Sequence, residues 1–228
     1  MTVGFQASLF DMGTTDGADV AAGTPGSAST PRLGELGATV QRHVLTRGAW
    51  VDVRAGWITG SDDVFAMLVQ TVPWQAERRQ MYERVVDVPR LLRFYGEDEP
   101  LPDPLLDEAR DALNAHYRGE LGEEFVTAGM CYYRDGRDSV AWHGDTIGRS
   151  RTEDTMVAIV SLGEARRLSL RPRTGGASRR HSLGFPLGHG DLIVMGGSCQ
   201  RTWEHAILKT ARPVGPRISV QFRPRGVR

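Results

Sequence analysis

The chain has 228 residues (25.1 kDa), 40% hydrophobic residues, and 28 basic and 28 acidic side chains, so its formal net charge is zero. This length suits one sizeable domain, and the charge balance argues against a protein that binds polyanions through bulk charge. No apolar run approaches the roughly 20 residues of a membrane span, and the N-terminus lacks a basic segment followed by an apolar one. We therefore predict a cytoplasmic monomer with no membrane partner.

The two cysteines, Cys131 and Cys199, are too few for a disulfide framework. Neither belongs to a CxxC pair that would suggest a zinc site. We expect both to be reduced, buried thiols.

Small and polar residues dominate the segment from 13 to 31, GTTDGADVAAGTPGSASTP. Such a segment has little to bury, so ordering it would cost entropy without return. We predict that residues 1–35 form a flexible N-terminal tail and that residues 36–228 form the folded domain.

Two amphipathic helices are expected in the first half of the chain. The first begins at Ser61-Asp62-Asp63 and ends before Pro73, and the second runs from Asp103-Pro104 to about Gly119. After Glu124 the sequence changes to short β-rich segments at 125–133, 155–163, 167–172, 191–197 and 217–222. The pattern predicts an α+β, mainly β fold, a sandwich or jelly roll with the helices packed outside one sheet.

The last β-rich segment alternates strictly between apolar and polar residues. Ile218, Val220 and Phe222 share one face of the strand, and Arg217 and Arg223 share the other. On an interior face the arginines would need an anionic partner to offset desolvation. The alternative is a half-exposed strand with both arginines in water.

The triplet His143-Gly144-Asp145 has the i, i+2 spacing that puts two side chains on one face of an extended segment. Non-haem Fe(II) sites use two histidines and one carboxylate, so a second histidine is needed. His181 lies in an Arg-rich loop, and His189 lies in a predicted turn. His205 precedes the last strand, and we expect it on the strand next to Arg217 and Arg223.

The order of these motifs resembles the AlkB-type family of Fe(II)- and 2-oxoglutarate-dependent dioxygenases, which repair alkylated nucleic acid. The resemblance extends from about Val44 to Arg223. It rests on YRDGRDSVAWHGD, MVAIVSLG, HGDLIVMGG, WEHAI and RISVQFR, and on the earlier stretch VDVPRLLRFYGE. It implies a jelly roll, also called a double-stranded β-helix.

The resemblance also assigns roles to single residues. It implies that His143, Asp145 and His205 bind Fe(II), and that Arg217 binds the distal carboxylate of 2-oxoglutarate with help from Tyr133. Arg223 matches a second family arginine near the cosubstrate and the target base. Cys131 and Ser219 stand where many relatives have asparagine, so the cosubstrate contacts, in which we include Ser219, are altered. Ile147 stands where relatives often have an acid, which leaves the base preference open.

The implied reaction is oxidative demethylation of N-alkylated bases in DNA with Fe(II), 2-oxoglutarate and O2, releasing succinate, CO2 and formaldehyde. A base must leave the stack to reach the metal. We expect Phe94, Tyr95 and Trp74 to contact that base and Arg90 to contact base or phosphate. Core packing and surface charge are the alternative roles for these residues. Arginines between Arg149 and Arg180 are candidates for phosphate contacts.

Near the N-terminus, Gln6-Ala7-Ser8-Leu9-Phe10 resembles the peptide by which bacterial DNA-processing proteins bind the replication sliding clamp. An unstructured end with no partner is the alternative.

Three other functions are compatible with parts of the pattern. They are an AlkB-like dioxygenase acting on RNA or protein, a nucleic-acid-binding module without turnover, and a zinc hydrolase. The intact triad together with Arg217 and Arg223 argues against the binding module. A zinc hydrolase would lack a general base and would leave the two arginines unexplained.

Overall fold

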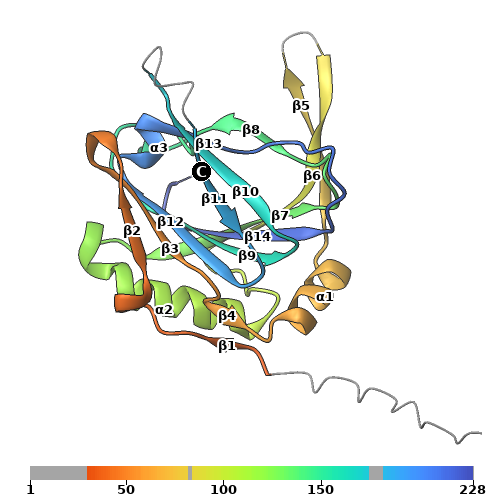
Figure 1. The fold of residues 1–228 in the computed structure, drawn as a ribbon, viewed down its shortest axis with the longest axis horizontal. Coiled ribbons are helices and arrows are strands. Elements are labelled where there is room, and N and C mark those ends of the chain that lie inside the picture. The colour runs from red at the N-terminus through yellow and green to blue at the C-terminus, as the bar shows by residue number, and fades with distance from the viewer. Residues whose placement is uncertain (1–29, 82–83, 175–181, 228) are drawn as a thin grey trace, which may run out of the picture.

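Two antiparallel sheets face each other in the computed structural model, which describes residues 30–81, 84–174 and 182–227 (Figure 1). The larger sheet has eight strands, in the spatial order β2 (Gln41–Val44), β3 (Ala49–Arg54), β12 (Asp191–Gly197), β9 (Val157–Gly163), β14 (Arg217–Pro224), β7 (Phe125–Tyr133), β6 (Arg84–Tyr95) and β5 (Gln75–Met81). The smaller sheet has four, in the order β11 (Leu183–Leu187), β10 (Arg166–Pro172), β13 (Trp203–Ile207) and β8 (Val140–His143).

The remaining elements are two short strands, two longer helices, one short helix and three 3₁₀ turns. Strands β1 (Arg32–Leu33) and β4 (Ile58–Thr59) pair with each other. Two longer helices, α1 (Asp62–Thr71) and α2 (Pro104–Leu121), lie along the outside of the larger sheet (Figure 1). The short elements are α3 (Cys199–Thr202) and the 3₁₀ turns η1 (Gly37–Thr39), η2 (Thr46–Gly48) and η3 (Arg149–Arg151).

Side-chain alternation on the central strands creates two separate cores. On β9, Ala158 and Val160 pack in the core beneath the helices, whereas Val157 and Ile159 pack in the core between the sheets. Residues two apart share one face of a strand, so each strand supplies both cores. This arrangement of helices outside one sheet of a mainly β jelly roll confirms the predicted fold class.

Helix α2 is longer at its C-terminus than predicted. The Asp103 side chain accepts a hydrogen bond from the Leu105 amide at 2.9 Å, and Pro104 occupies the first turn, as the sequence indicates. Gly119 lies inside the helix, and Gly122 ends it with φ of 66°. A left-handed residue at this position favours glycine, so the helix stops there.

Two strand features go beyond the sequence predictions, and several predicted residues lie outside the described parts of the chain. Strand β1 lies within residues 1–35, the segment that we predict to be the N-terminal tail. The hairpin of β5 and β6 was not predicted, because residues 75–95 show no clear alternation. The segment Gln6–Phe10, His181 and the arginines between 175 and 180 lie outside the described residues.

Among the described helices, none is both long enough and apolar enough to cross a membrane.

The packing of α2 against the core beneath the helices gives a prediction for stability. Leu106 is completely buried in that core, so Leu106→Ala should lower the free energy of unfolding by about 2–5 kcal/mol, as measured by urea denaturation. The matched control is Leu183→Ala on β11, where the side chain is 42% exposed, with an expected change within about 0.5 kcal/mol. Equal losses for the two variants would contradict this packing.

Candidate functional site

Two strands of the smaller sheet bring His143, Asp145 and His205 together. His143 ends β8, and its partner in the register of β13 is His205. Asp145 follows β8 by two residues. One ligand atom from each of the three residues lies within 4.8 Å of the others.

The prediction that His205 lies on the strand next to Arg217 and Arg223 is wrong. Strand β13 pairs with β8 and β10, whereas β14, which carries Arg217 and Arg223, pairs with β7 and β9 in the other sheet. His205 therefore faces the arginine strand across the interior. In a jelly roll, strands close in sequence alternate between sheets, so order along the chain did not imply adjacency.

The imidazole of His143 is oriented by the backbone. Its Nδ1 lies 2.8 Å from the Ala141 carbonyl oxygen, and a carbonyl accepts, so Nδ1 carries the proton and donates. The lone pair of Nε2 is then available to a metal ion. Nε2 lies 3.5 Å from Oδ1 of Asp145, and the rings of His143 and His205 are 4.2 Å apart between centroids.

His205 is held in its neutral form. The side chain is buried, and burial together with the nearby His143 lowers its pKa to about 3, although Asp145 acts in the opposite direction. A metal ligand must be unprotonated. His205 therefore meets this requirement at neutral pH.

Asp145 is fixed by side chains from two other elements. Nε and Nη2 of Arg223 both lie 2.8 Å from Oδ2, so Oδ1 remains directed at His143. Burial alone would raise the pKa of Asp145, but the charge of Arg223 outweighs this effect and holds the pKa well below its ordinary value. The amide of Asp145 donates to Oε1 of Gln200 at 3.0 Å.

The glycine between the two ligands is required by space. A Cβ at Gly144 would collide with the Gln200 carbonyl oxygen and would lie 2.7 Å from Nη2 of Arg173. The turn can therefore approach α3 only without a side chain. The site therefore brings two imidazole nitrogens and one carboxylate oxygen close together. These three atoms fit the donor set of a non-haem Fe(II) site.

Arg217 is a buried cation without a carboxylate partner among the described residues. Its side chain is 1% exposed, its Nε donates to Ser161 Oγ at 2.9 Å, and its Nη1 has no partner there. Burial lowers the pKa of the guanidinium below its ordinary value. An unpaired buried charge is costly, so the site fits an anion, such as a carboxylate of 2-oxoglutarate.

Tyr133 lies beside Arg217. Its ring centroid is 5.4 Å from the Arg217 guanidinium carbon. Burial raises the pKa of its hydroxyl above the ordinary value, so the group keeps its proton and can donate a hydrogen bond to the same anion.

A cavity of about 740 Å³ joins these groups, and its volume is within the usual range for ligand sites. It contains the residues predicted to bind metal and cosubstrate, and it also reaches Ile147, which is 68% exposed. The predicted ligand and cosubstrate residues in its lining are His143, Asp145, His205, Tyr133, Arg217, Ser219 and Arg223.

The residues predicted to contact a base separate into two groups. Arg90 and Phe94 line the cavity, and Phe94 is 44% exposed. Tyr95 is 5% exposed and packs in the core beneath the helices, so its predicted contact with a base is wrong. Adjacent residues of a strand point to opposite faces, and only one of the two aromatics can face the cavity. Trp74 packs against the same core, and its ring lies 5.3 Å from that of Tyr132 between centroids, at an interplanar angle of 33°.

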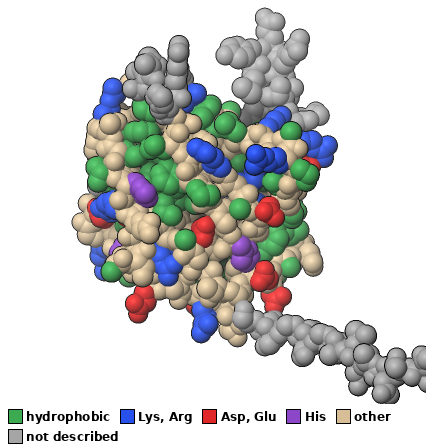
Figure 2. Space-filling view, in the orientation of Figure 1, with side chains coloured by type: hydrophobic (Ala, Val, Ile, Leu, Met, Phe, Trp, Pro, Cys, Tyr) green, Lys and Arg blue, Asp and Glu red, His purple; other side chains and the backbone are tan. Residues whose placement is uncertain are grey.

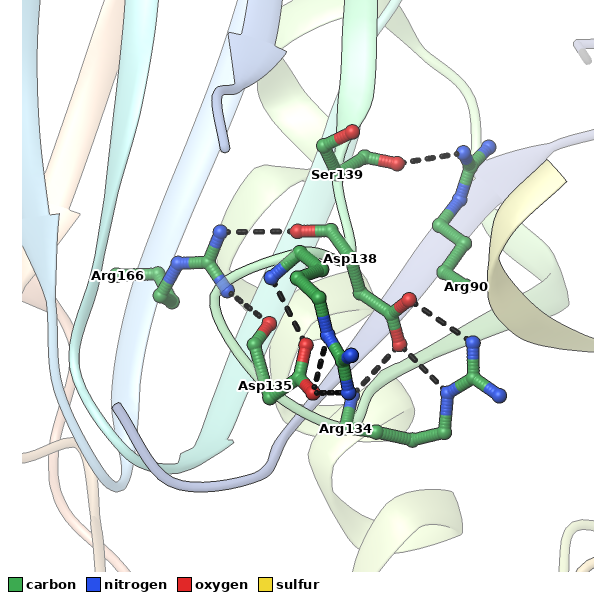
Figure 3. Close-up of polar contacts among 7 residues, drawn as sticks. Arg90, Arg134, Asp135, Asp138, Ser139 and Arg166 are labelled. Atoms are coloured by element: carbon green, nitrogen blue, oxygen red, sulfur yellow. Dashed lines mark hydrogen bonds and ion pairs between the residues drawn. The ribbon is translucent and has the colours of Figure 1, made fainter. Parts of the chain in front are cut away.

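A network of arginines holds the turn between β7 and β8 (Figure 3). Arg166 donates to the carbonyl oxygens of Asp135 and Asp138, both at 3.0 Å, and Arg90 donates to that of Ser139 at 3.1 Å. The Asp138 carboxylate accepts two hydrogen bonds from the Arg134 side chain at 2.8 and 2.9 Å. This turn sets the position of His143 relative to Tyr133.

His189 has a structural role, in the turn where it was predicted. Its Nδ1 accepts from the Gly163 amide at 2.8 Å, so the protonated Nε2 donates to Ser61 Oγ at 2.7 Å.

Sequence reasoning missed Gln200 and Gln221. Gln221 bonds to Arg223 and Ser219, and the alternation on the last strand already places it on the arginine face. No local signal identifies Gln200, because α3 meets the HGD turn only in the folded protein.

The family model described as the 2OG-Fe(II) oxygenase superfamily matches residues 89–223. This match covers more than half of the chain, which therefore belongs to that superfamily. The matched segment contains the triad and both arginines. The residues present fit the Fe(II) and 2-oxoglutarate that members of this family use.

Among curated proteins, the chain is similar to AlkB homologues. It is 29% identical over 190 residues to alpha-ketoglutarate-dependent dioxygenase alkB homolog 3 of Bos taurus, covering 73% of this chain and 64% of that protein. It is 28% identical over 182 residues to DNA oxidative demethylase ALKBH2 of Homo sapiens, covering 72% and 68%. The chain thus spans about two thirds of the length of these relatives. The solved structure of OsALKBH1 has the same fold, with a TM-score of 0.54 and 13% identity over 80% of this chain and 99% of that one.

Arg217 has no carboxylate partner among the described residues, so substituting it should change the affinity for 2-oxoglutarate. Arg217→Lys keeps one charge but loses the planar fork that matches a carboxylate. We expect 2-oxoglutarate to bind about 10- to 100-fold more weakly, in anaerobic calorimetry with Mn(II)-loaded protein. Arg167→Lys, the same change at an exposed position of β10, is the control and should bind like wild type. Equal affinities for all three proteins would refute the anion site at Arg217.

Proposed function

We propose that this protein demethylates N-alkylated bases in DNA, with His143, Asp145 and His205 as the Fe(II) ligands. When bound, Fe(II) and 2-oxoglutarate supply the oxidation of an N-methyl group by dioxygen, which releases formaldehyde, succinate and CO2. The observation that carries the proposal is the pairing, in one cavity, of this triad with a buried Arg217 that lacks an anionic partner among the described residues.

The chain's own residues position the reactants. Arg217 and the Tyr133 hydroxyl bind the distal carboxylate of 2-oxoglutarate, with Ser219 beside them. Arg223 holds Oδ2 of Asp145, so Oδ1 is the oxygen presented to the metal. Arg217, Tyr133 and Asp145 are all buried, and the low dielectric of a buried site strengthens their electrostatic interactions.

Features of the cavity mouth support a nucleic-acid substrate. Phe94 lines the cavity with a side chain that is 44% exposed and can contact a base that has left the stack, and Arg90 lines the same cavity. In the space-filling view, basic side chains gather on the side of the molecule where β6 lies (Figure 2). One relative is named a DNA oxidative demethylase, and this similarity favours DNA over RNA.

The proposal is tested with protein reconstituted anaerobically with Fe(II) and 2-oxoglutarate. Oxygen is then added with N-methylated oligonucleotides of one sequence, as single-stranded DNA, double-stranded DNA or RNA. We expect equal amounts of succinate and formaldehyde, formed fastest with DNA. His205→Ala should lower both by at least about 100-fold because a ligand is lost. Faster turnover of RNA would favour the RNA alternative, and no formaldehyde above unmethylated controls would overturn the proposal.

Binding of a sliding clamp through Gln6–Phe10 also stays a prediction. A pull-down on immobilised bacterial clamp should retain the intact protein and lose the double variant Gln6→Ala, Leu9→Ala. Equal retention of both proteins would reject the clamp motif. The predicted monomeric state is measured independently by light scattering.

A further inference from the structure

Four residues on the inner face of β14 connect the two ends of the cavity. They are Arg217, Ser219, Gln221 and Arg223, spaced by two along the strand, and all of them line the cavity. Arg217 lies at the anion end and Arg223 at the metal end. Gln221 is the residue between them whose contacts have no assigned role.

The carboxamide of Gln221 bonds in both directions. Its Oε1 accepts from Nη2 of Arg223 at 3.1 Å, and its Nε2 donates to Ser219 Oγ at 2.6 Å and to Cys131 Sγ at 3.3 Å. The amide orientation follows from these partners, because a guanidinium can only donate and must face the oxygen. Both ends of the amide are therefore engaged.

The geometry points to Gln221 as a positioning residue for the metal ligand Asp145. An arginine side chain has several rotatable bonds, and holding it in one conformation costs entropy. Nη2 of Arg223 contacts both Gln221 and Oδ2 of Asp145. The amide thus fixes the guanidinium in the orientation that occupies Oδ2 and leaves Oδ1 as the single metal-binding oxygen.

Gly129 leaves the space that the guanidinium of Arg223 occupies. It lies on β7, opposite Gln221 in the register with β14. A Cβ at Gly129 would lie 2.7 Å from Nη1 of Arg223 and 3.4 Å from Oε1 of Gln221. The first distance is too short, so any side chain there would displace the guanidinium. Gly129 and Gln221 together define the space in which Arg223 can hold Asp145.

The inference rests on the metal site proposed above and is tested by metal binding without substrate. Protein is titrated anaerobically with Co(II), and the d–d absorption is recorded. Gln221→Met keeps the side-chain volume but removes the hydrogen bonds, and we expect about 10-fold weaker Co(II) binding with a changed d–d spectrum. Gly129→Ala should give the same two effects by displacing Arg223 directly, which provides a second variant if the first fails to fold.

The control is Gln41→Met, the same change at an exposed position of β2, which should match wild type in affinity and spectrum. Wild-type Co(II) affinity and spectrum in folded Gln221→Met and Gly129→Ala would overturn the positioning role and leave the metal site intact. A wild-type protein that fails to bind Co(II) would overturn both proposals. The thermal unfolding temperature of each variant separates loss of folding from loss of positioning.

Discussion

The alternation of side chains on β14 is the constraint on which the rest of the molecule depends. Its apolar residues pack beneath the helices, and its polar residues enter the space between the sheets. A one-residue change of register would exchange the two sets, placing guanidinium groups against α1 and α2. The stability of the helical layer and the chemistry of the cavity are therefore set by the same strand.

The two arginines on one face of this strand differ in whether another charge within the described chain balances their own. Arg223 is paired with a buried carboxylate, so its charge is balanced within the chain. Arg217 is bonded to a hydroxyl and faces an aromatic ring, neither of which carries a charge. The first arginine is part of a finished network, whereas the second has a charge that an anionic ligand would neutralise.

The sequence predicted the residues of the site better than it predicted their surroundings. The spacing of His143 and Asp145 and the alternation of β14 are local patterns, and both persist in the folded protein. The pairing of β13 with β8, the contact of Gln200 with Asp145 and the burial of Tyr95 depend on how distant segments meet. In residues 90–95 both faces of the strand carry large side chains, so periodicity could not distinguish the cavity face from the core face.

The unbalanced charge of Arg217 also links folding to the supply of small molecules. A buried cation disfavours the native state, and an anion that binds only the folded protein restores that free energy by mass action. The chain would then be least resistant to heat and proteolysis when its carboxylate ligand is scarce. The amount of intact protein in a cell would in this way follow the concentration of a metabolite.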